Sequence, residues 1–309
     1  MASVERSGVR RRGRLAVAGA LLLAALMVAG AEASAASGAD SRPRTPIPAF
    51  LLDRGRYVKF DHPDAVGETA AGSVNNRGQV VGRYTDTPSV QDPSATNRGY
   101  LLDRGRLTRL DPPGAVSSQA VGINNRGQVV GEYRDAAGAY HGYLWQRGRF
   151  TTIDLPGAAA SSLRAINDRG QILGAWADDR GTFHGFLLDR GRFRTFDGPA
   201  GTVFLPTDLN DRGQVVGSTL APTAADPLAG ARGFLLAKGP GGPFTPIDVP
   251  GAPRNLVFGL NDRGQLVGAY ENTATAPAPA GAPTMDGLTQ GSGREPTGNG
   301  SARSRSSML

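Results

Sequence analysis

The feature that most constrains this chain is a nine-residue phrase that recurs five times. Its clearest copy, at residues 166–174, reads Ile-Asn-Asp-Arg-Gly-Gln-Ile-Leu-Gly. The asparagine of the phrase stands at positions 75, 124, 167, 210 and 261, so successive copies are 43 to 51 residues apart. A period of this length indicates a solenoid, a propeller or another array of small units.

A second phrase alternates with the first and completes a repeat unit. It reads Leu-Leu-Asp-Arg-Gly-Arg in three copies, between flanks whose residue types are typical of strands. In both phrases we expect a hairpin with a type I turn followed by glycine at positive φ. Between the phrases, Pro156 and Gly157 suit the centre of a type II turn. The pattern defines five units: 50–84, 100–133, 143–176, 186–219 and 234–270.

The units predict an all-β fold, a five-bladed β-propeller of four-stranded antiparallel blades. Four short strands in about 45 residues match the size of one blade. Within residues 214–217, Val215, Val216 and Gly217 are apolar at consecutive positions, as expected for a sheet that is covered on both faces. If blades begin between the two phrases, the last hairpin needs a partner, and the hairpin at Phe50 is expected to supply it and close the ring. The alternative architecture is an open β-solenoid of the same hairpins.

The segments that flank the repeats differ from them in composition. Residues 1–33 contain Arg-Arg-Arg-Gly-Arg, then a 16-residue apolar run, then Ala-Glu-Ala, which is the pattern of a cleaved signal peptide. The run is shorter than the roughly 20 residues that span a bilayer. We therefore expect a secreted protein that is cleaved near Ala33. A flexible lead-in follows over 34–47, then the repeats over 48–270 and a disordered tail over 271–309.

The repeated phrases also resemble a known family. Gly-Ile-Asn-x-Arg-Gly-Gln-Val-Val-Gly, with the neighbouring stretches Tyr-His-Gly-Tyr-Leu and Thr-Thr-Ile-Asp-Leu-Pro-Gly, is similar to the bacterial HAF repeat proteins over residues 48–270. The chain departs from the His-Gly-Phe signature of the family, because only His141 and His184 keep the histidine and other copies have Arg98 and Arg232. The resemblance implies export and a β-rich repeat fold, and it implies no defined activity.

The composition excludes several kinds of chemistry. The 309 residues include no cysteine, so disulfides, thiolate metal sites and cysteine catalysis are absent. The net charge is +7, but the arginines lie mostly in the signal peptide and in repeated turns, so no nucleic-acid partner is expected. Neither a Gly-x-Ser-x-Gly elbow nor a phosphate-binding loop occurs. We expect no cofactor.

The candidate binding residues occupy one equivalent position in four repeats. Arg98, His141, His184 and Arg232 each stand immediately before a Gly-aromatic pair. All four carry hydrogen-bond donors, and we expect them to form a rim that binds sugars or carboxylates. A zinc site usually needs three or four ligands, and arginines at the equivalent positions would repel a metal, so no metal site is expected.

Two further positions recur with the units. An aspartate precedes the turn between the phrases, and we expect it to cap that turn by accepting backbone N–H bonds. A ring of carboxylates that binds cations or sugar hydroxyls is the alternative for these residues, Asp61, Asp111, Asp154, Asp197 and Asp248. An aromatic residue follows the Val-Gly step or its equivalent, and we expect it to pack between neighbouring sheets rather than to stack on sugars. These aromatics are Tyr84, Tyr133, Trp176 and Tyr270.

These observations favour a secreted, non-catalytic, monomeric repeat protein that acts as a binding module for carbohydrate or for a surface protein. The alternative is a glycan hydrolase on the same propeller, which needs two carboxylates in different environments. Acids outside the repeat pattern lack a supporting motif, and they are Glu68, Glu132, Asp135, Asp178, Asp226 and Glu271. A third interpretation is a repeat spacer whose C-terminal tail makes the interactions.

Overall fold

The described part of the chain consists of strands and turns, without a helix. In the computed structural model this part comprises residues 47–53, 55–86, 96–221, 226 and 228–271. The predicted signal peptide lies outside these residues, as do the predicted lead-in and tail except for Ile47 and Glu271. Ile47, the last residue of the predicted lead-in, forms a parallel bridge with Glu68. Within the described ranges, no helical segment has the length and apolarity needed to cross a bilayer.

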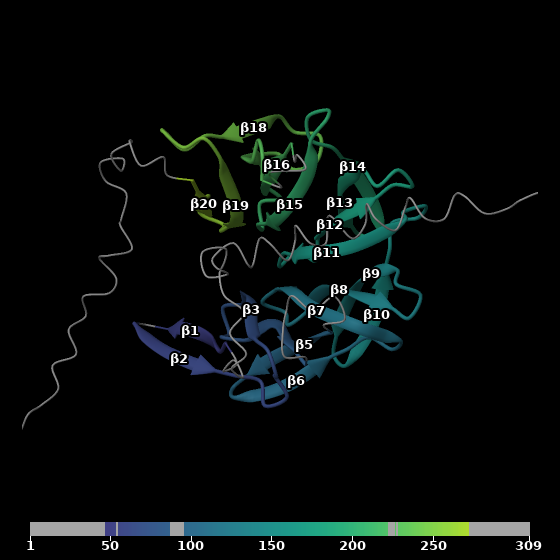
Figure 1. The fold of residues 1–309 in the computed structure, drawn as a ribbon, viewed down its shortest axis with the longest axis vertical. Coiled ribbons are helices and arrows are strands. Elements are labelled where there is room, and N and C mark those ends of the chain that lie inside the picture. Colours follow the sequence, from purple (N-terminus) through teal and green to yellow (C-terminus); the bar gives the residue numbers. More distant parts are fainter. Residues whose placement is uncertain (1–46, 54, 87–95, 222–225, 227, 272–309) are drawn as a thin grey trace, which may run out of the picture. The chain divides into compact units, whose positions relative to one another are not determined.

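Four antiparallel sheets of four strands each make up most of the structure (Figure 1). The first two sheets contain β3 (Thr69–Val74), β4 (Val80–Thr85), β5 (Asn97–Asp103), β6 (Arg106–Leu110), and then β7 (Ala115–Ile123), β8 (Val129–Asp135), β9 (Tyr140–Gln146), β10 (Arg149–Ile153). The other two contain β11 (Ala160–Ile166), β12 (Ile172–Ala177), β13 (Phe183–Asp189), β14 (Arg192–Phe196), and then β15 (Val203–Leu209), β16 (Val215–Leu220), β17 (Arg232–Leu236), β18 (Phe244–Ile247). Two separate hairpins remain, which are β1 (Ala49–Asp53) with β2 (Arg56–Phe60) and β19 (Asn255–Leu260) with β20 (Leu266–Tyr270).

The boundary between sheets falls between the two phrases of each unit. In every four-stranded sheet, the first two strands form the Asn-Arg-Gly-Gln hairpin of one unit. The last two strands form the first hairpin of the next unit, and the four strands follow one another in simple meander order. The prediction of five complete blades is therefore corrected to four blades and two half-blades. The first and last hairpins form two-stranded sheets, because no hydrogen-bonded ladder joins β20 to β1 among the described strands.

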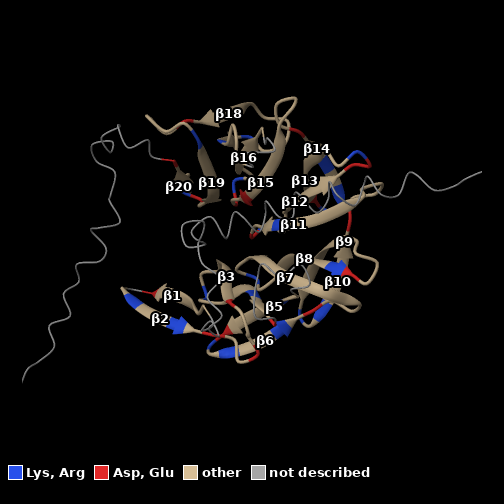
Figure 2. Cartoon of the chain, in the orientation of Figure 1, with Lys and Arg blue, Asp and Glu red and all other residues tan. Residues whose placement is uncertain are grey.

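Successive sheets pack against each other as the blades of a propeller. The second strand of each blade contacts the first strand of the next, as β4 contacts β7, β8 contacts β11, β12 contacts β15 and β16 contacts β19. Consecutive residues of the second strands are buried, with Val215 and Val216 both 0% exposed, as the consecutive apolar residues predict. Lys and Arg are interspersed with Asp and Glu over all the sheets (Figure 2).

The two kinds of hairpin use different turns. In the first phrase, the Gly170 N–H donates to the carbonyl of Asn167 and the Asn167 N–H to that of Gln171, with Gly170 at φ 80°, so the predicted turn and glycine bulge are confirmed. In the second phrase, Arg190 and Gly191 form a two-residue loop in which both have positive φ. The expected type I turn is wrong there, because a two-residue loop needs the opposite backbone twist of a type I′ turn.

The repeated asparagine joins neighbouring blades as well as shaping its own turn. The Oδ1 atom of Asn167 accepts the N–H groups of Arg169 and Gln171, and its Nδ2 donates to Gln171 Oε1. The same Nδ2 also donates, at 3.0 Å, to the carbonyl of Asn210 in the next copy of the turn. Four such links connect the five turns: Asn75 to Asn124, Asn124 to Asn167, Asn167 to Asn210, and Asn210 to Asn261. We call this series the amide ladder.

A second set of bonds runs beside the amide ladder. The residue after each asparagine uses its backbone N–H to donate to the side chain of its counterpart in the next turn. Asn125, for example, donates from its backbone to Asp168 Oδ1 at 2.7 Å and from its side chain to Asp168 Oδ2 at 2.6 Å. The bonds of this second set are part-buried or exposed, whereas the amide-ladder bonds from Asn75, Asn124 and Asn167 are buried and meet little competition from water.

Candidate functional site: cation–carboxylate clusters

The four predicted rim residues occupy one register position on the third strand of each blade. Across the sheet, Arg98 pairs with Tyr84, His141 with Tyr133, and His184 with Trp176. Arg232 pairs with Thr219. Each therefore lies beside the residue that follows the Val-Gly step of the second strand. The structure brings each rim residue together with partners of its own blade.

Each rim residue faces the repeated aspartate at the end of the fourth strand. His141 Nδ1 lies 2.7 Å from Asp154 Oδ2, and His184 Nδ1 lies 2.6 Å from Asp197 Oδ1. Arg98 lies 3.6 Å from Asp111, and Arg232 lies 3.9 Å from Asp248. The expectation that the aspartates cap their own turns is wrong for Asp111, Asp154 and Asp197, because a basic side chain on the adjacent strand binds the carboxylate. We call each such group a cation–carboxylate cluster.

A second acid completes the cluster in the blades that carry histidine. Asp135 Oδ2 lies 3.4 Å from His141 Nε2, and Asp178 Oδ2 lies 3.7 Å from His184 Nε2. Both acids open the turn after the second strand, six residues before the histidine. By sequence, both are among the acids outside the repeat pattern, but their shared spacing from a histidine is the signal that each belongs to the cluster of its own blade.

The electrostatics of the His141 cluster favour the charged imidazole. Burial acts to lower the pKa of His141, but the hydrogen bonds and charges of Asp154 and Asp135 outweigh it and raise the pKa above its ordinary value. The pKa of Asp135 is lowered, chiefly by the N–H of Ala139 and also by His141. The cluster therefore favours the imidazolium form of His141, which lies between two carboxylates.

This arrangement predicts how His141 contributes to stability as the pH changes. Because the folded-state pKa is raised, the contribution is fully present below the unfolded-state pKa of about 6.5 and is lost as the pH rises through the folded-state value. We expect the difference in unfolding free energy between wild type and His141→Gln to be larger near about pH 5.5 than near about pH 8.5. Urea denaturation at the two pH values measures it, and an equal or reversed difference would contradict the assignment.

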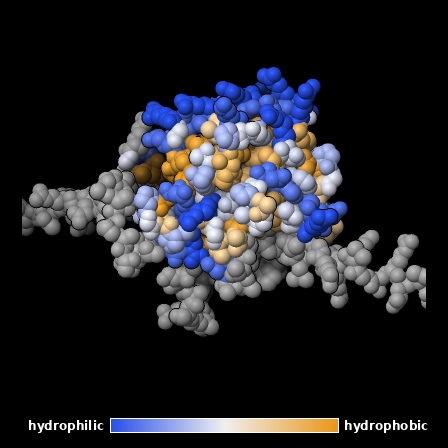
Figure 3. Space-filling view, turned by 90° about the horizontal axis from the view of Figure 1, so that it is seen from above, coloured by the Kyte–Doolittle hydropathy of each residue, from blue (hydrophilic) through white to orange (hydrophobic). Residues whose placement is uncertain are grey.

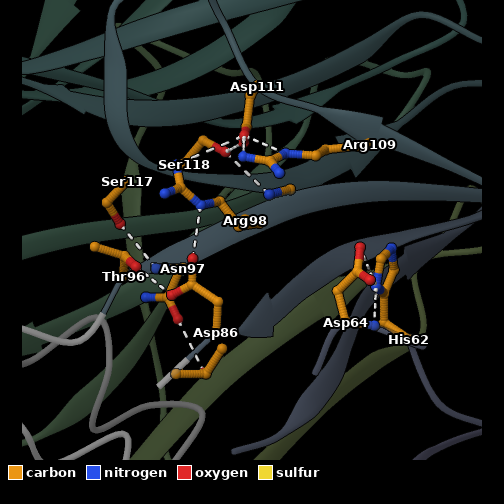
Figure 4. Close-up of polar contacts among 12 residues, drawn as sticks. His62, Asp64, Asp86, Thr96, Asn97, Arg98, Arg109, Asp111, Ser117 and Ser118 are labelled. Carbon is orange, nitrogen blue, oxygen red and sulfur yellow. Dashed lines mark hydrogen bonds and ion pairs between the residues drawn. The ribbon is translucent and has the colours of Figure 1, made fainter. Parts of the chain in front are cut away.

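The Arg98 cluster is more enclosed and reaches the next blade. Figure 4 shows Arg98 between the carboxylates of Asp86 and Asp111, with its Nε 3.0 Å from Asp86 Oδ2. Asp111 is also bound by Arg109 and accepts a hydrogen bond from Ser118, at the start of the next blade. The side chains of Arg98 and Asp111 are each 18% exposed. Arg98, Arg109 and Ser118 already bind the carboxylate of Asp111, so few hydrogen-bonding positions are left for a ligand.

Of the two clusters that contain histidine, the His184 cluster has the more exposed aspartate. The Asp197 side chain is 68% exposed, and its Oδ1 is held by His184. Its other oxygen, Oδ2, has no hydrogen-bond partner within the described ranges. The ring of Trp176 stacks on His184 with centroids 4.3 Å apart, and this fixes the imidazole from the other side. An oriented carboxylate with one unused oxygen is a hydrogen-bond acceptor for a ligand.

Two of the repeated aromatics stack on the histidine of their own blade. Tyr133 stacks on His141 at 5.1 Å, as Trp176 does on His184. Trp176 also packs against a core cluster that includes Val130 of the preceding blade, as the expected packing between sheets predicts. Tyr84 is 1% exposed and stacks at 3.7 Å on His62, which precedes the blade in sequence. Tyr270, in the last half-blade, is 46% exposed.

The other four acids outside the repeat pattern are bound by partners away from the clusters. Glu68 is paired with Arg83. The Glu132 carboxylate accepts a hydrogen bond from Gln119 at 2.7 Å. Asp226 and Glu271 share Arg254. Among the residues that the structure describes, no group of three or more His, Asp or Glu side chains is arranged to hold a metal ion.

Comparisons with known proteins give no close relative. No protein-family model matches the chain, and no curated protein does. The fold is similar to the β-propeller domain of the trilobed protease from Pyrococcus furiosus, with 12% identity, 63% of this chain and 54% of that chain covered, and a TM-score of 0.40. TolB from Acinetobacter baumannii is similar at 14% identity, with 61% and 45% covered and a TM-score of 0.41.

A third similar structure is the Aleuria aurantia lectin in complex with Fucα1-6GlcNAc. It has 9% identity, covers 72% of this chain and 84% of that one, and has a TM-score of 0.42. The chain spans about half the length of the protease domain and of TolB. At this level the likeness extends to the architecture and no further.

Proposed function

We propose that this chain is a secreted, non-catalytic binding module that recognises carbohydrate through its cation–carboxylate clusters. The observation that carries the proposal is the exposed Asp197 carboxylate, which His184 holds in place at 2.6 Å while its Oδ2 has no partner in the described structure. The equivalent Asp154, in the preceding blade, is 36% exposed and is held by His141.

The chemistry of these clusters suits the hydroxyl groups of a sugar. A carboxylate accepts hydrogen bonds from hydroxyls, and charge-assisted bonds of this kind are stronger than neutral ones. Because each histidine already orients its aspartate, binding loses little side-chain entropy. The same cluster recurs in neighbouring blades, so an extended or branched glycan that reaches two clusters gains from the high effective concentration of the second.

The distribution of the other acids supports a binding role over hydrolysis. A glycosidase places two carboxyl groups on either side of one scissile bond, with separations of about 5–10 Å. Glu68, Glu132 and Asp226 are instead held by separate partners in different blades.

Export and family remain part of the proposal. The signal pattern of residues 1–33 supports cleavage near Ala33, and the repeated phrases support membership of the HAF repeat proteins. We further propose that the scaffold has five blades, the fifth being completed by the two terminal hairpins. Mass spectrometry of the protein recovered from the medium tests export, since an intact N-terminus would contradict cleavage.

A glycan array on the mature protein tests the ligand class. We expect binding to a small set of glycans, and loss of it in a variant with Arg98, His141, His184 and Arg232 all changed to alanine. The variant needs an unchanged circular dichroism spectrum, so that lost binding reports the clusters and not unfolding. If no glycan binds, or if the variant binds every glycan as the wild type does, the proposal is wrong.

A further inference from the structure

The two terminal hairpins are complementary halves of one blade. Every complete sheet begins with the hairpin of the Asn-Arg-Gly-Gln phrase and ends with the hairpin that follows it. The β19–β20 hairpin is of the first kind and the β1–β2 hairpin is of the second. A blade in the order β19-β20-β1-β2 would therefore repeat the other four.

Each terminal hairpin already makes the inter-blade contacts of its half. β1 contacts β3 as β5 contacts β7 and β9 contacts β11, that is, as a third strand contacts the first strand of the next blade. The N–H of Thr69 donates to the carbonyl of Ile47 at 2.9 Å and secures this contact. β19 contacts β16 as a first strand contacts the second strand of the preceding blade. Both hairpins are thus docked on the propeller, and each lacks the other half.

The apolar residues that the missing pairing would cover are exposed. Among the residues that the structure describes, seven of the ten large exposed apolar side chains lie on these four strands: Phe50, Leu52, Tyr57, Val58, Phe258, Val267 and Tyr270. Apolar surface lies beside strongly hydrophilic surface on the face shown in Figure 3. Phe50 is 60% exposed, whereas its counterparts Tyr100, Tyr143, Phe186 and Phe234 are all 0% exposed.

Each of these four rings fills a defined space in its blade. Each lies across from the glycine of the second strand, as Phe186 does from Gly174 and Phe234 from Gly217. A Cβ on Gly217 would lie 2.8 Å from the ring of Phe234, so the glycine makes room for the ring. The fifth glycine is Gly268, and the nearest atoms to its missing Cβ belong to Leu256 and Val257 instead of to a ring.

The amide ladder has two open ends that match. Each asparagine amide donates to the carbonyl of the next turn, but the Nδ2 of Asn261 donates only to Gln265 within the described residues. At the other end, the carbonyl of Asn75 accepts the N–H of Gly78 and receives no amide from another turn. The second set of bonds, which runs beside the amide ladder, ends in the same way. Its next donor would be the backbone N–H of Asp262, and its next acceptor would be the side chain of Asn76.

We propose that the exposed edge of β20 is an interaction surface whose occupant is β1 of the same chain, completing a fifth blade and a closed ring. Equivalence with the complete blades sets the register: Gly268 opposite Phe50, Val267 opposite Leu51, and Leu266 opposite Leu52. The fifth rung of the ladder joins the Asn261 amide to the Asn75 carbonyl. Because both halves belong to one chain, their effective concentration favours this pairing over pairing with a second copy.

A disulfide between introduced cysteines tests the pairing, because the chain has no cysteine of its own. In the full mature chain, Leu51→Cys with Val267→Cys is expected to form an intramolecular disulfide in the monomer under mild oxidation. The control pairs Leu52→Cys with Val267→Cys, which the same register puts on opposite faces of the sheet, so no disulfide is expected. Reduced thiols in the first variant, or disulfide-linked dimers, would overturn the proposal.

A second measurement does not depend on introduced thiols. Phe50→Ala is expected to lower the thermal midpoint by about as much as Phe186→Ala. In the closed propeller, each aromatic side chain fills the equivalent space across from the second-strand glycine. An unchanged midpoint for Phe50→Ala beside a clear loss for Phe186→Ala would show that Phe50 stays exposed, and the closed ring would be wrong. Neither experiment involves a glycan, so both outcomes are independent of the proposed function.

Discussion

Replacing Asn167 by alanine is expected to lower the free energy of unfolding by about 3–5 kcal/mol, among the largest effects of any single change in the chain. The side chain accepts two backbone N–H groups of its own turn and donates to the carbonyl of Asn210. Asn167 is 5% exposed, so water cannot fully replace these partners. The loss therefore includes the cost of leaving two backbone N–H groups of the turn without their acceptor, and the loss of the bond to the next blade.

Arg169→Ala is the matched control for this experiment. Arg169 belongs to the same turn, and its side chain is exposed, so its removal should change the unfolding free energy by no more than about 0.5 kcal/mol. Urea denaturation of both variants gives the comparison. Similar stabilities for Asn167→Ala and Arg169→Ala would mean that the amide ladder does not hold the blades together.

Gly131→Ala is expected to be comparably destabilising, by about 3–5 kcal/mol, for a steric reason. A Cβ at this position on β8 would overlap the carbonyl oxygen of Gln119 on β7 and would lie 2.9 Å from the ring of Tyr143. Tyr143 is 0% exposed and has no space to move into. The neighbouring strand must therefore shift, which breaks the packing of a whole blade.

Gly138→Ala separates this overlap from the ordinary strain of replacing a glycine. Gly138 has a φ of 84°, and an added Cβ would meet no atom within 4 Å. Its replacement should cost about 1–2 kcal/mol, the cost of a left-handed backbone for alanine. Thermal and urea unfolding of both variants measure the difference. A loss at Gly131 that is no larger than the loss at Gly138 would contradict the close packing inferred at β8.

Much of the blade could be predicted from the repeat itself. The period predicted four-stranded units, consecutive apolar residues such as Val215 and Val216 predicted strands buried on both faces, and Gly170 predicted a backbone at positive φ. Each of these depends on residues close in sequence, whose geometry is set by local chemistry.

The contacts between repeats were not predictable in the same way. Asn167 was interpreted as a turn residue, which it is, but its bond to Asn210 joins residues 43 positions apart and depends on how blades stack. The aspartates were expected to serve their own turns, because the sequence does not show that His141 and Asp154 meet across two strands. Asp135 and Asp178 were set apart as isolated acids for the same reason.

The central claim, that ordered and exposed carboxylates of the blades bind carbohydrate, is tested most directly by measuring the affinity of a glycan found on the array. Titration calorimetry of that glycan is proposed with the wild type, Asp197→Asn and Asp179→Asn. Asp179 is an exposed acid beside Asp178, and Asp179→Asn removes the same charge at a position outside the cluster. We expect Asp197→Asn to weaken binding by about tenfold, the loss of one charge-assisted hydrogen bond, and Asp179→Asn to leave it unchanged. Equal affinities for all three proteins would contradict the claim.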